Sequence, residues 1–256
     1  MLPLERRNWI ESQILANGKV EIEDLSNELN VSSMTIRRDL AELERLGKAI
    51  RTHGGAISPD SLIREVPYSA KESRNINQKK VIAQNALQLI PKNANIILDS
   101  GTTTLELAKL LKSRNDITVI TNDIKIAVEL MDSELKVIVA GGELQTNVGA
   151  LSGWPTQEFF KKIHVDLFFM GVHAIDLKAG ITSPSFEKSL IKKLMLDSAA
   201  VTWALIDSSK FNKKSFSTVC PITSLEGIIT DDGLDLDIRE EYEEYVAINY
   251  CGGEHN

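Results

Sequence analysis

Cysteine is scarce in this chain of 256 residues, which holds only Cys220 and Cys251. The two lie far apart in sequence and no histidine cluster lies near them, so the spacing excludes a disulfide framework and a cysteine-based zinc site. Disulfides are characteristic of oxidising compartments and are rare in the cytosol. We therefore expect a cytoplasmic protein without a metal site.

Long hydrophobic runs are also missing. No apolar run approaches the roughly 20 residues that span a bilayer, and the segment Met1–Arg7 lacks the apolar core of a signal peptide. Hydrophobic residues make up 43% and charged residues 25% of the chain, the profile of a globular protein. We expect two domains of ordinary size, no membrane partner and no cofactor.

Positive charge is in short supply as well. With 29 basic and 36 acidic residues the formal net charge is −7, which argues against indiscriminate binding to nucleic acid. Residues 1–57 hold eight basic and nine acidic side chains, so this segment is not basic as a whole. The acids Glu21, Glu23, Asp24 and Glu28 precede Val31, however, and several bases follow from Arg37 onward. Any surface for nucleic acid must therefore be small and local.

Residues 1–57 carry the signals of three short helices and a hairpin. Ser32 has the side chain of a helix N-cap, and the helix after it continues with an apolar stripe at Ile36, Leu40 and Leu43. The next stretch, "KAIRTHGGAI", alternates apolar and polar residues and turns at Gly54-Gly55, which suits a β-hairpin. This order of elements predicts a winged helix-turn-helix domain.

The helix that begins near Ser33 is the predicted reader of DNA. In a winged helix-turn-helix domain this helix enters the major groove, and guanidinium groups suit both phosphates and guanine edges. The candidate DNA-binding residues on the helix and the wing are Ser32, Ser33, Thr35, Arg37, Arg38, Arg51 and His53. Two alternatives stay open: the Arg37-Arg38-Asp39 stretch is a solvated face paired within itself, and His53 is only a turn residue.

The rest of the chain changes character. Residues 58–75 contain two prolines and no clear period, and they predict a linker with room for one helical turn. Over residues 76–256, amphipathic helical stretches alternate with apolar runs, namely "NIILDS", "ITVIT", "KVIVA", "VDLFFMG", "VTWALID" and "GIIT". Such alternation predicts an α/β domain around a mainly parallel sheet.

Ligands of open parallel sheets bind at the carboxyl ends of the strands. The first predicted strand ends in a glycine and four hydroxyl residues directly before a helix, where backbone N–H groups and the helix dipole favour an anion. The candidate residues of this loop are Asp99, Ser100, Gly101, Thr102, Thr103 and Thr104. The competing interpretation is that the hydroxyls are plain helix caps.

Other predicted strand ends and helix starts add polar groups to the same edge, and the candidates among them are Asn122, Gly142, Glu187 and Lys210. A lysine at this edge neutralises a phosphate, and a glutamate accepts hydrogen bonds from sugar hydroxyls. With the 99–104 loop these residues predict a pocket for a phosphorylated sugar or polyol. Each also has a plain structural explanation, since Glu187 suits a helix start and Lys210 a surface loop.

The stretch "VSSMTIRRDLAELERLGKAIRTHGGA" resembles the signature of the DeoR-type bacterial transcriptional regulators, and "DSGTTT", "GG", "GIT" and "DSSKF" follow in the order of that family's C-terminal domain. The resemblance covers nearly the whole chain. It implies a winged-helix domain that binds operator DNA, a sensor domain similar to ribose-5-phosphate isomerase, and a homo-oligomer, either dimer or tetramer. It assigns DNA contacts to Thr35, Arg37 and Arg38, and effector contacts to the 99–104 loop, Asn122, Glu187 and Lys210. One departure is Glu143-Leu144-Gln145, where such proteins often place an arginine after the two glycines.

Three functions compete. The first, which we predict, is a DNA-binding repressor of a sugar or polyol catabolic operon that is relieved by a phosphorylated sugar and has no catalytic residue. The second is a sugar-phosphate isomerase with an N-terminal appendage, with Glu187 as base and Lys210 as phosphate clamp. The third is a regulator whose pocket is only structural. An isomerase has no need of a capped helix with paired arginines and a wing, which favours the first.

Overall fold

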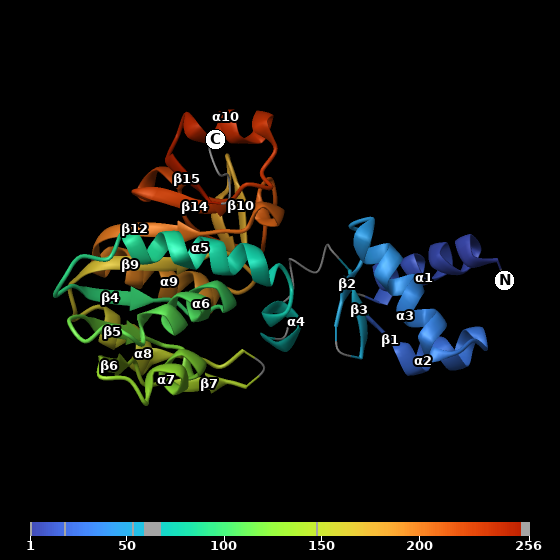
Figure 1. Ribbon diagram of the computed structural model, residues 1–256, viewed down its shortest axis with the longest axis horizontal. Helices are drawn as coiled ribbons and strands as arrows, with labels where there is room; N and C mark the ends of the chain where they lie inside the picture. Colours follow the sequence, from blue (N-terminus) through green and yellow to red (C-terminus); the bar gives the residue numbers. More distant parts are fainter. Residues whose placement is uncertain (1, 18, 53, 59–67, 147, 252–256) are drawn as a thin grey trace. The chain divides into compact units, whose positions relative to one another are not determined.

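A computed structural model describes residues 2–17, 19–52, 54–58, 68–146 and 148–251 of the chain (Figure 1). The chain divides into two compact units, Met1–Ser73 and Arg74–Asn256. Within the segment 58–75 that the sequence predicts as a linker, the structure describes one short helix, α4 (Tyr68–Glu72). No helix in the described part of the chain is long and apolar enough to cross a membrane.

The first unit is a winged helix-turn-helix domain, as predicted. Its elements are α1 (Pro3–Asn17), β1 (Lys19–Glu21), α2 (Ile22–Leu29), α3 (Ser33–Arg45), β2 (Ile50–Arg51) and β3 (Gly55–Ile57). The three strands pair antiparallel in the order β1-β3-β2. The apolar stripe of α3 is buried against α1 and α2, in a cluster that includes Ile10, Ile14 and Leu25. Burial of this stripe fixes which face of α3 remains exposed.

The strand β3 requires glycine at its start. A Cβ placed on Gly55 would lie 1.8 Å from the backbone oxygen of Val20 in β1, far inside van der Waals contact. Only a residue without a side chain allows β3 to approach β1 this closely. The sequence places the turn of the hairpin at Gly54-Gly55, but in the structure Gly55 already belongs to the paired strand β3.

The second unit is built around a seven-stranded parallel sheet of order β15-β14-β12-β9-β4-β5-β6. Its strands are β4 (Asn95–Leu98), β5 (Thr118–Thr121), β6 (Lys136–Val139), β9 (Val165–Gly171), β12 (Ala199–Leu205), β14 (Gly227–Asp231) and β15 (Ala247–Cys251). The chain runs outward from β4 to one edge and then outward from β9 to the other, so the order reverses between β4 and β9. Such a switch point leaves a crevice at the carboxyl ends of the two strands, where ligands bind in open α/β sheets.

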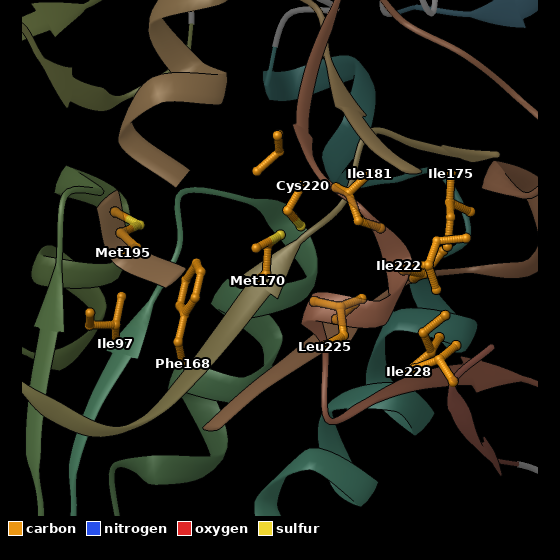
Figure 2. Close-up of a cluster of buried hydrophobic side chains, with 14 of the residues drawn as sticks. Ile97, Phe168, Met170, Ile175, Ile181, Met195, Cys220, Ile222, Leu225 and Ile228 are labelled. Atoms are coloured by element: carbon orange, nitrogen blue, oxygen red, sulfur yellow. The ribbon is translucent and has the colours of Figure 1, made fainter. Parts of the chain in front are cut away.

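Helices cover both faces of this sheet. On one face, Ile97 of β4 and Phe168 and Met170 of β9 pack with Met195 of α9 (Phe186–Ser198) in a large buried cluster (Figure 2). The residues of opposite parity, such as Ile96 and Leu98, are fully buried too. Their face is covered by α5 (Ile76–Gln88) and α6 (Thr102–Leu111), which pack against each other and reach β14 and β9. A strand buried on both sides has the continuous apolar sequence that these runs show.

Among the remaining elements, the helices fit the predicted alternation and the short antiparallel strands lie outside it. These remaining elements are α7 (Ile124–Leu130), the hairpin β7 (Glu143–Gln145) and β8 (Ala150–Ser152), α8 (Trp154–Phe160), α10 (Leu236–Glu243), and an antiparallel sheet of β10 (Ala174–Asp176), β11 (Gly180–Ser183) and β13 (Ser217–Cys220). Two 3-10 turns follow β12 and β13, at Ser208–Lys210 and Ile222–Ser224. The strands of the antiparallel sheet have three or four residues. An alternating pattern of apolar and polar residues over so few positions cannot be distinguished from the sequence of a loop.

Candidate functional site

Ser32 caps the start of α3, as predicted. Its Oγ accepts a hydrogen bond from the backbone N–H of Thr35 at 3.2 Å and lies 3.0 Å from the Thr35 hydroxyl. The cap satisfies one of the free donors of the first turn and holds the helix start in one geometry. Two of the predicted DNA-binding residues, Ser32 and Thr35, therefore already bond to each other at the exposed tip of α3.

Arg37 and Arg38 lie on the exposed face of α3, whereas Ile36 and Leu40 point into the core. Neither guanidinium forms an ion pair or hydrogen bond with another residue in the described part of the chain. Ser33 is exposed one turn before Arg37, on the same face. Two adjacent cations without an ion-pair partner among the described residues form a small positive surface on a domain that is not basic overall.

Asp39 does not neutralise these two arginines. Its side chain is buried, at 4% exposure, and its Oδ2 accepts a hydrogen bond from Arg6 Nε of α1 at 2.5 Å. Arg7 Nη1 lies 3.8 Å from the other carboxylate oxygen. Asp39 thus joins α3 to α1, and the alternative in which Arg37, Arg38 and Asp39 pair among themselves is wrong.

The wing is anchored to the end of α3. The backbone N–H of Arg51 in β2 donates to the Glu44 carboxylate at 3.1 Å, and the Arg51 guanidinium lies 4.0 Å from the same group. Arg51 is half-buried. Unlike Arg37 and Arg38, this candidate DNA contact has an acidic partner, Glu44. His53, the other wing candidate, lies outside the described residues.

The loop after β4 has the predicted strand-to-helix form. Gly101 is the N-cap residue of α6, and Thr102 and Thr103 open the helix. The Ser100 hydroxyl donates to Asp123 Oδ2 at 2.6 Å, and the Thr104 hydroxyl donates to the backbone oxygen of Asp99 at 2.6 Å. Two of the four hydroxyls therefore shape the loop itself. The backbone N–H groups of the first turn of α6 are the donors that an anion would meet here.

Asp99 has a partner that the sequence did not suggest. Its Oδ2 accepts hydrogen bonds from the backbone N–H of Gly171 at 3.0 Å and from Lys192 Nζ of α9. Lys192 also donates to the backbone oxygen of Gly171 at 2.7 Å. Both charged side chains are buried, and the pair lies at the switch point between β4 and β9. Asp99 thus forms a buried ion pair with Lys192 and also belongs to the 99–104 loop. Because the sequence shows Lys192-Lys193 as an ordinary polar stretch of a helix, no local signal marks Lys192 as buried.

The end of β5 adds a second buried carboxylate. Asp123 is fully buried and caps α7 by accepting from the backbone N–H of Lys125 at 2.7 Å. Burial raises the pKa of Asp123, against hydrogen bonds from Ser100 and from backbone N–H groups that lower it. The neighbouring Asn122 donates from Nδ2 to the backbone oxygen of Leu151 at 2.9 Å. Its Oδ1 is buried and has no hydrogen-bond partner among the described residues, which is uncommon for a buried polar atom.

Gly142 and Glu187 serve different parts of the fold. Gly142 has a φ of +156°, and a Cβ there would lie 2.2 Å from both the backbone oxygen of Ser152 and the Thr156 hydroxyl, so the fold itself demands glycine. Glu187 is half-buried in the first turn of α9, which Ser185 caps. Glu187 forms no hydrogen bond within the described residues, so no hydrogen bond links it to the other candidates there.

The motif "DSSKF" forms a turn at the end of β12, where Asp207 is buried and Lys210 closes a 3-10 turn. Asp207 Oδ1 accepts a hydrogen bond from Asn75 Nδ2 at 2.9 Å and another from the Ser209 hydroxyl. Burial raises the pKa of Asp207, but the charge of Lys210 and the bonds from Ser209 and Asn75 outweigh it, and the pKa is lowered. Asp207 is therefore ionised and already shared among several donors.

Three cations, Lys79, Lys210 and Arg74, act at this turn. The buried Lys79 of α5 has a pKa lowered to about 8, because burial disfavours its charge and because Lys210 and Arg74 repel it. Asp207 and Glu106 attract it, but Glu106 also pairs with Lys109 at 2.6 Å. Sequence reasoning missed Lys79 because it stands beside the exposed Lys80 in an ordinary amphipathic helix. A buried lysine among further cations is a site where a multivalent anion is stabilised.

This arrangement predicts a pH-dependent penalty on stability. Lys79 has a folded pKa of about 8 against an ordinary 10.5, so the unfolded state binds more protons between these values and stability rises with pH in that window. At pH 7 the Lys79→Met variant should therefore be more stable than the wild type by up to about 3 kcal/mol. The gain should fade as pH passes about 10. Urea unfolding of both proteins at pH 7 and at about pH 10 measures the difference in their free energy of unfolding.

The matched control for that prediction is Lys80→Met, which changes an exposed lysine of the same helix. This variant should shift the free energy of unfolding by no more than about 0.5 kcal/mol at either pH. A gain in Lys79→Met that stays the same at neutral and alkaline pH would show that it comes from packing and not from removal of a buried charge.

Comparison with known proteins relates both units of the chain to described families. A family profile described as "DeoR-like helix-turn-helix domain" matches residues 6–62, and one described as "DeoR C terminal sensor domain" matches residues 74–232. Similar proteins include the HTH-type transcriptional regulator GlpR of Haloferax volcanii, 36% identical over 95% of this chain and 95% of its own. The putative aga operon transcriptional repressor of Escherichia coli is 34% identical over 92% of this chain and 89% of its own.

A third similar protein is the lactose phosphotransferase system repressor of Staphylococcus epidermidis, 32% identical over 95% of this chain and 98% of its own. Among solved structures, ribose 5-phosphate isomerase A of Methanocaldococcus jannaschii matches with a TM-score of 0.41 at 17% identity. That match covers 54% of this chain and 55% of the isomerase.

Proposed function

This chain belongs to the DeoR family of transcriptional regulators, and from that premise we propose that it represses a sugar or polyol catabolic operon and leaves its operator when a phosphorylated sugar binds the C-terminal domain. Two of its relatives are named as repressors of the aga operon and of the lactose phosphotransferase system. The chain matches both over almost its whole length, so the likeness includes the sensor domain as well as the DNA-binding domain.

The exposed face of α3 supports the DNA-binding part of the proposal. A helix capped at Ser32 and buried along its apolar stripe presents Arg37 and Arg38 outward, where they find no acidic partner in the described structure. The recognition helix of this type of domain enters the major groove with its first residues against the bases. Ser33 and Thr35 occupy those first positions, and one domain alone offers few contacts. We therefore also propose a homo-oligomer, dimer or tetramer, which would supply affinity through several domains.

The observation that carries the effector part is the group of cations around Asp207. Lys210 and Arg74 both repel the buried Lys79 there, and the buried acids Asp207 and Glu106 lie among these cations. A phosphate dianion would relieve that repulsion, and Lys and helix N-terminal N–H groups are its usual ligands. The hydroxyl loop at the start of α6 and the buried, unpaired Oδ1 of Asn122 lie at the same carboxyl edge of the sheet. These groups suit a small polyol that carries one phosphate.

The isomerase alternative has less support. Three relatives that match nearly the whole chain are named as transcriptional regulators or repressors. Glu187, the base that an isomerase would need, makes no hydrogen bond within the described residues that would position it. Asp99 is already occupied by Lys192. The exposed arginines of α3 would also have no role in proton transfer.

The experiment that tests the proposal is a thermal-shift screen of the full chain with phosphorylated sugars and polyols, each beside its unphosphorylated parent. One phosphorylated compound should stabilise the protein by about 2.7 kcal/mol at ~100 times its Kd, which raises Tm by roughly 5–10 °C. The parent compound should not. The same compound should release the protein from operator DNA, because it can shift the equilibrium only by binding the two states unequally.

Gly101→Val serves as the matched variant for this screen. A Cβ at Gly101 would lie 3.3 Å from the Thr104 hydroxyl, and the rest of the valine would obstruct the helix start where the anion is expected. The variant should keep operator binding and lose the thermal shift. If no compound shifts the wild type, the pocket is structural; if ribose 5-phosphate is turned over, the isomerase alternative is correct.

A further inference from the structure

Asn75 stands where the sensor unit begins. The boundary between the two units falls after Ser73, and α5 starts at Ile76. Asn75 is the N-cap residue of α5, with a left-handed backbone at φ 52°. Asparagine tolerates this conformation better than most residues. Every displacement of the chain between the DNA-binding domain and α5 must pass through this position.

The side chain of Asn75 does not cap its own helix, although asparagine is among the preferred capping residues. Instead its Nδ2 donates to Asp207 Oδ1 at 2.9 Å and to the Ser209 hydroxyl at 3.3 Å. Both partners belong to the turn after β12, more than 130 positions later in the chain. The start of α5 is therefore tied to the turn that carries Lys210.

Asp207 contacts both Asn75 at the start of α5 and the turn that carries Lys210. It is buried, accepts the Asn75 bond, and feels the charge of Lys210, whose backbone N–H donates to the Asp207 backbone oxygen at 3.0 Å. An anion that binds Lys210 would neutralise part of the charge that acts on Asp207. The carboxylate would then redistribute its bonds among Asn75, Ser209 and the nearby cations.

We propose that the Asn75–Asp207 hydrogen bond couples the effector site to the linker of the DNA-binding domain, so that a change of charge at Lys210 alters how the start of α5 is held. The inference rests on the proposed function, since it takes Lys210 as an effector contact. Asn75 is a positioning residue in this scheme and touches neither DNA nor effector. It gives the two sites one shared element whose arrangement both can bias, which is the physical requirement for allostery.

The test is a double-mutant cycle on operator affinity, with Lys210→Met as a substitute for neutralisation of Lys210 and Asn75→Ala as the break in the connection. In the full-length wild-type background Lys210→Met should change the Kd for operator DNA by about 5-fold or more, the lower range of allosteric couplings. In the Asn75→Ala background the same change should move the Kd by less than about 2-fold. Fluorescence anisotropy with a labelled operator fragment measures all four proteins.

Asn85→Ala is the control background. Asn85 is an exposed residue of the same helix that donates to the Val81 backbone oxygen at 3.0 Å, so Lys210→Met should keep its full effect there. Equal effects of Lys210→Met in the wild-type and Asn75→Ala backgrounds would overturn the coupling. So would an absence of any effect in the wild type.

A rescue variant separates the hydrogen bond from simple damage to the fold. In Asn75→Asp two carboxylates would face each other across 2.9 Å, and the effect of Lys210→Met should be lost. Adding Asp207→Asn restores one amide and one carboxylate in exchanged positions, and the effect should return. If it does not return although both proteins unfold at the wild-type Tm, the bond is not the coupling element.

Inorganic phosphate, compared with chloride at equal ionic strength, distinguishes this inference from the proposed function. Stabilisation of the wild type by phosphate supports the anion site independently of the cycle. Phosphate stabilisation with an additive cycle means that the anion site is real and the coupling is wrong. A non-additive cycle without phosphate stabilisation means that the coupling is real and the proposed effector chemistry is wrong.

Discussion

Arg37→Ala and Arg38→Ala should each weaken operator binding by about 1–3 kcal/mol, or roughly 5- to 150-fold in Kd, if the guanidinium reads a guanine edge. The reason is geometric. Both side chains extend from the capped start of α3 and remain exposed, while Asp39 between α3 and α1 is satisfied by Arg6. Their charges are therefore free to meet DNA without first breaking an internal pair. Anisotropy titration of each variant against operator and against unrelated DNA measures the loss.

The salt dependence of binding distinguishes a base contact from a phosphate contact. Loss of a phosphate contact should weaken binding to all sequences alike and lower the slope of log K against log salt by about 1. Loss of a base contact should leave that slope unchanged and reduce only the preference for operator over unrelated DNA. Arg45→Ala is the control, because Arg45 lies in the last turn of α3 and is paired with Glu42 at 2.6 Å. Operator binding that is unchanged in Arg37→Ala and Arg38→Ala would remove α3 as the recognition helix.

The DNA-binding domain was predictable because its signals are local. The Ser32 cap, the spacing of Ile36, Leu40 and Leu43, and the alternation after Gly47 all act over a few residues, so the sequence alone shows them. The same holds for the parallel strands, whose burial on both faces appears as continuous apolar runs. The final strand β15, "AINYC", was missed because its exposed and buried residues are mixed at the edge of the sheet.

The candidate sites were less predictable because their partners are distant in sequence. Periodicity shows which way a side chain faces but not which group it meets. Asp39 meets Arg6 over 33 positions, Asp99 meets Lys192 over 93, and Asn75 meets Asp207 over 132. Each pair joins elements whose contact depends on the tertiary fold. Lysines are almost never fully buried unless paired. The sequence therefore gives no reason to expect Lys79 and Lys192 in the interior of the domain.

Lys192→Met should destabilise the sensor domain by about 3–5 kcal/mol, the usual effect of removing one partner of a buried ion pair. Lys192 contributes the side-chain cation at Asp99 and also satisfies the Gly171 backbone oxygen. Without it Asp99 must either stay charged in a buried place or bind a proton, and both raise the free energy of the folded state. Urea unfolding followed by circular dichroism measures the change.

Two further variants decide whether the buried pair is the cause. Lys193→Met alters the adjacent exposed lysine, which pairs with Asp197 at 2.5 Å on the helix surface, and it should cost no more than about 0.5 kcal/mol. The double variant Asp99→Asn with Lys192→Met should recover much of the loss, because it leaves no uncompensated buried charge. If Lys192→Met unfolds at the same urea concentration as Lys193→Met, the carboxylate at the switch point is solvated. Asp99 would then be free to bind the effector directly, and the phosphate would have to share the crevice between β4 and β9 with a negative charge.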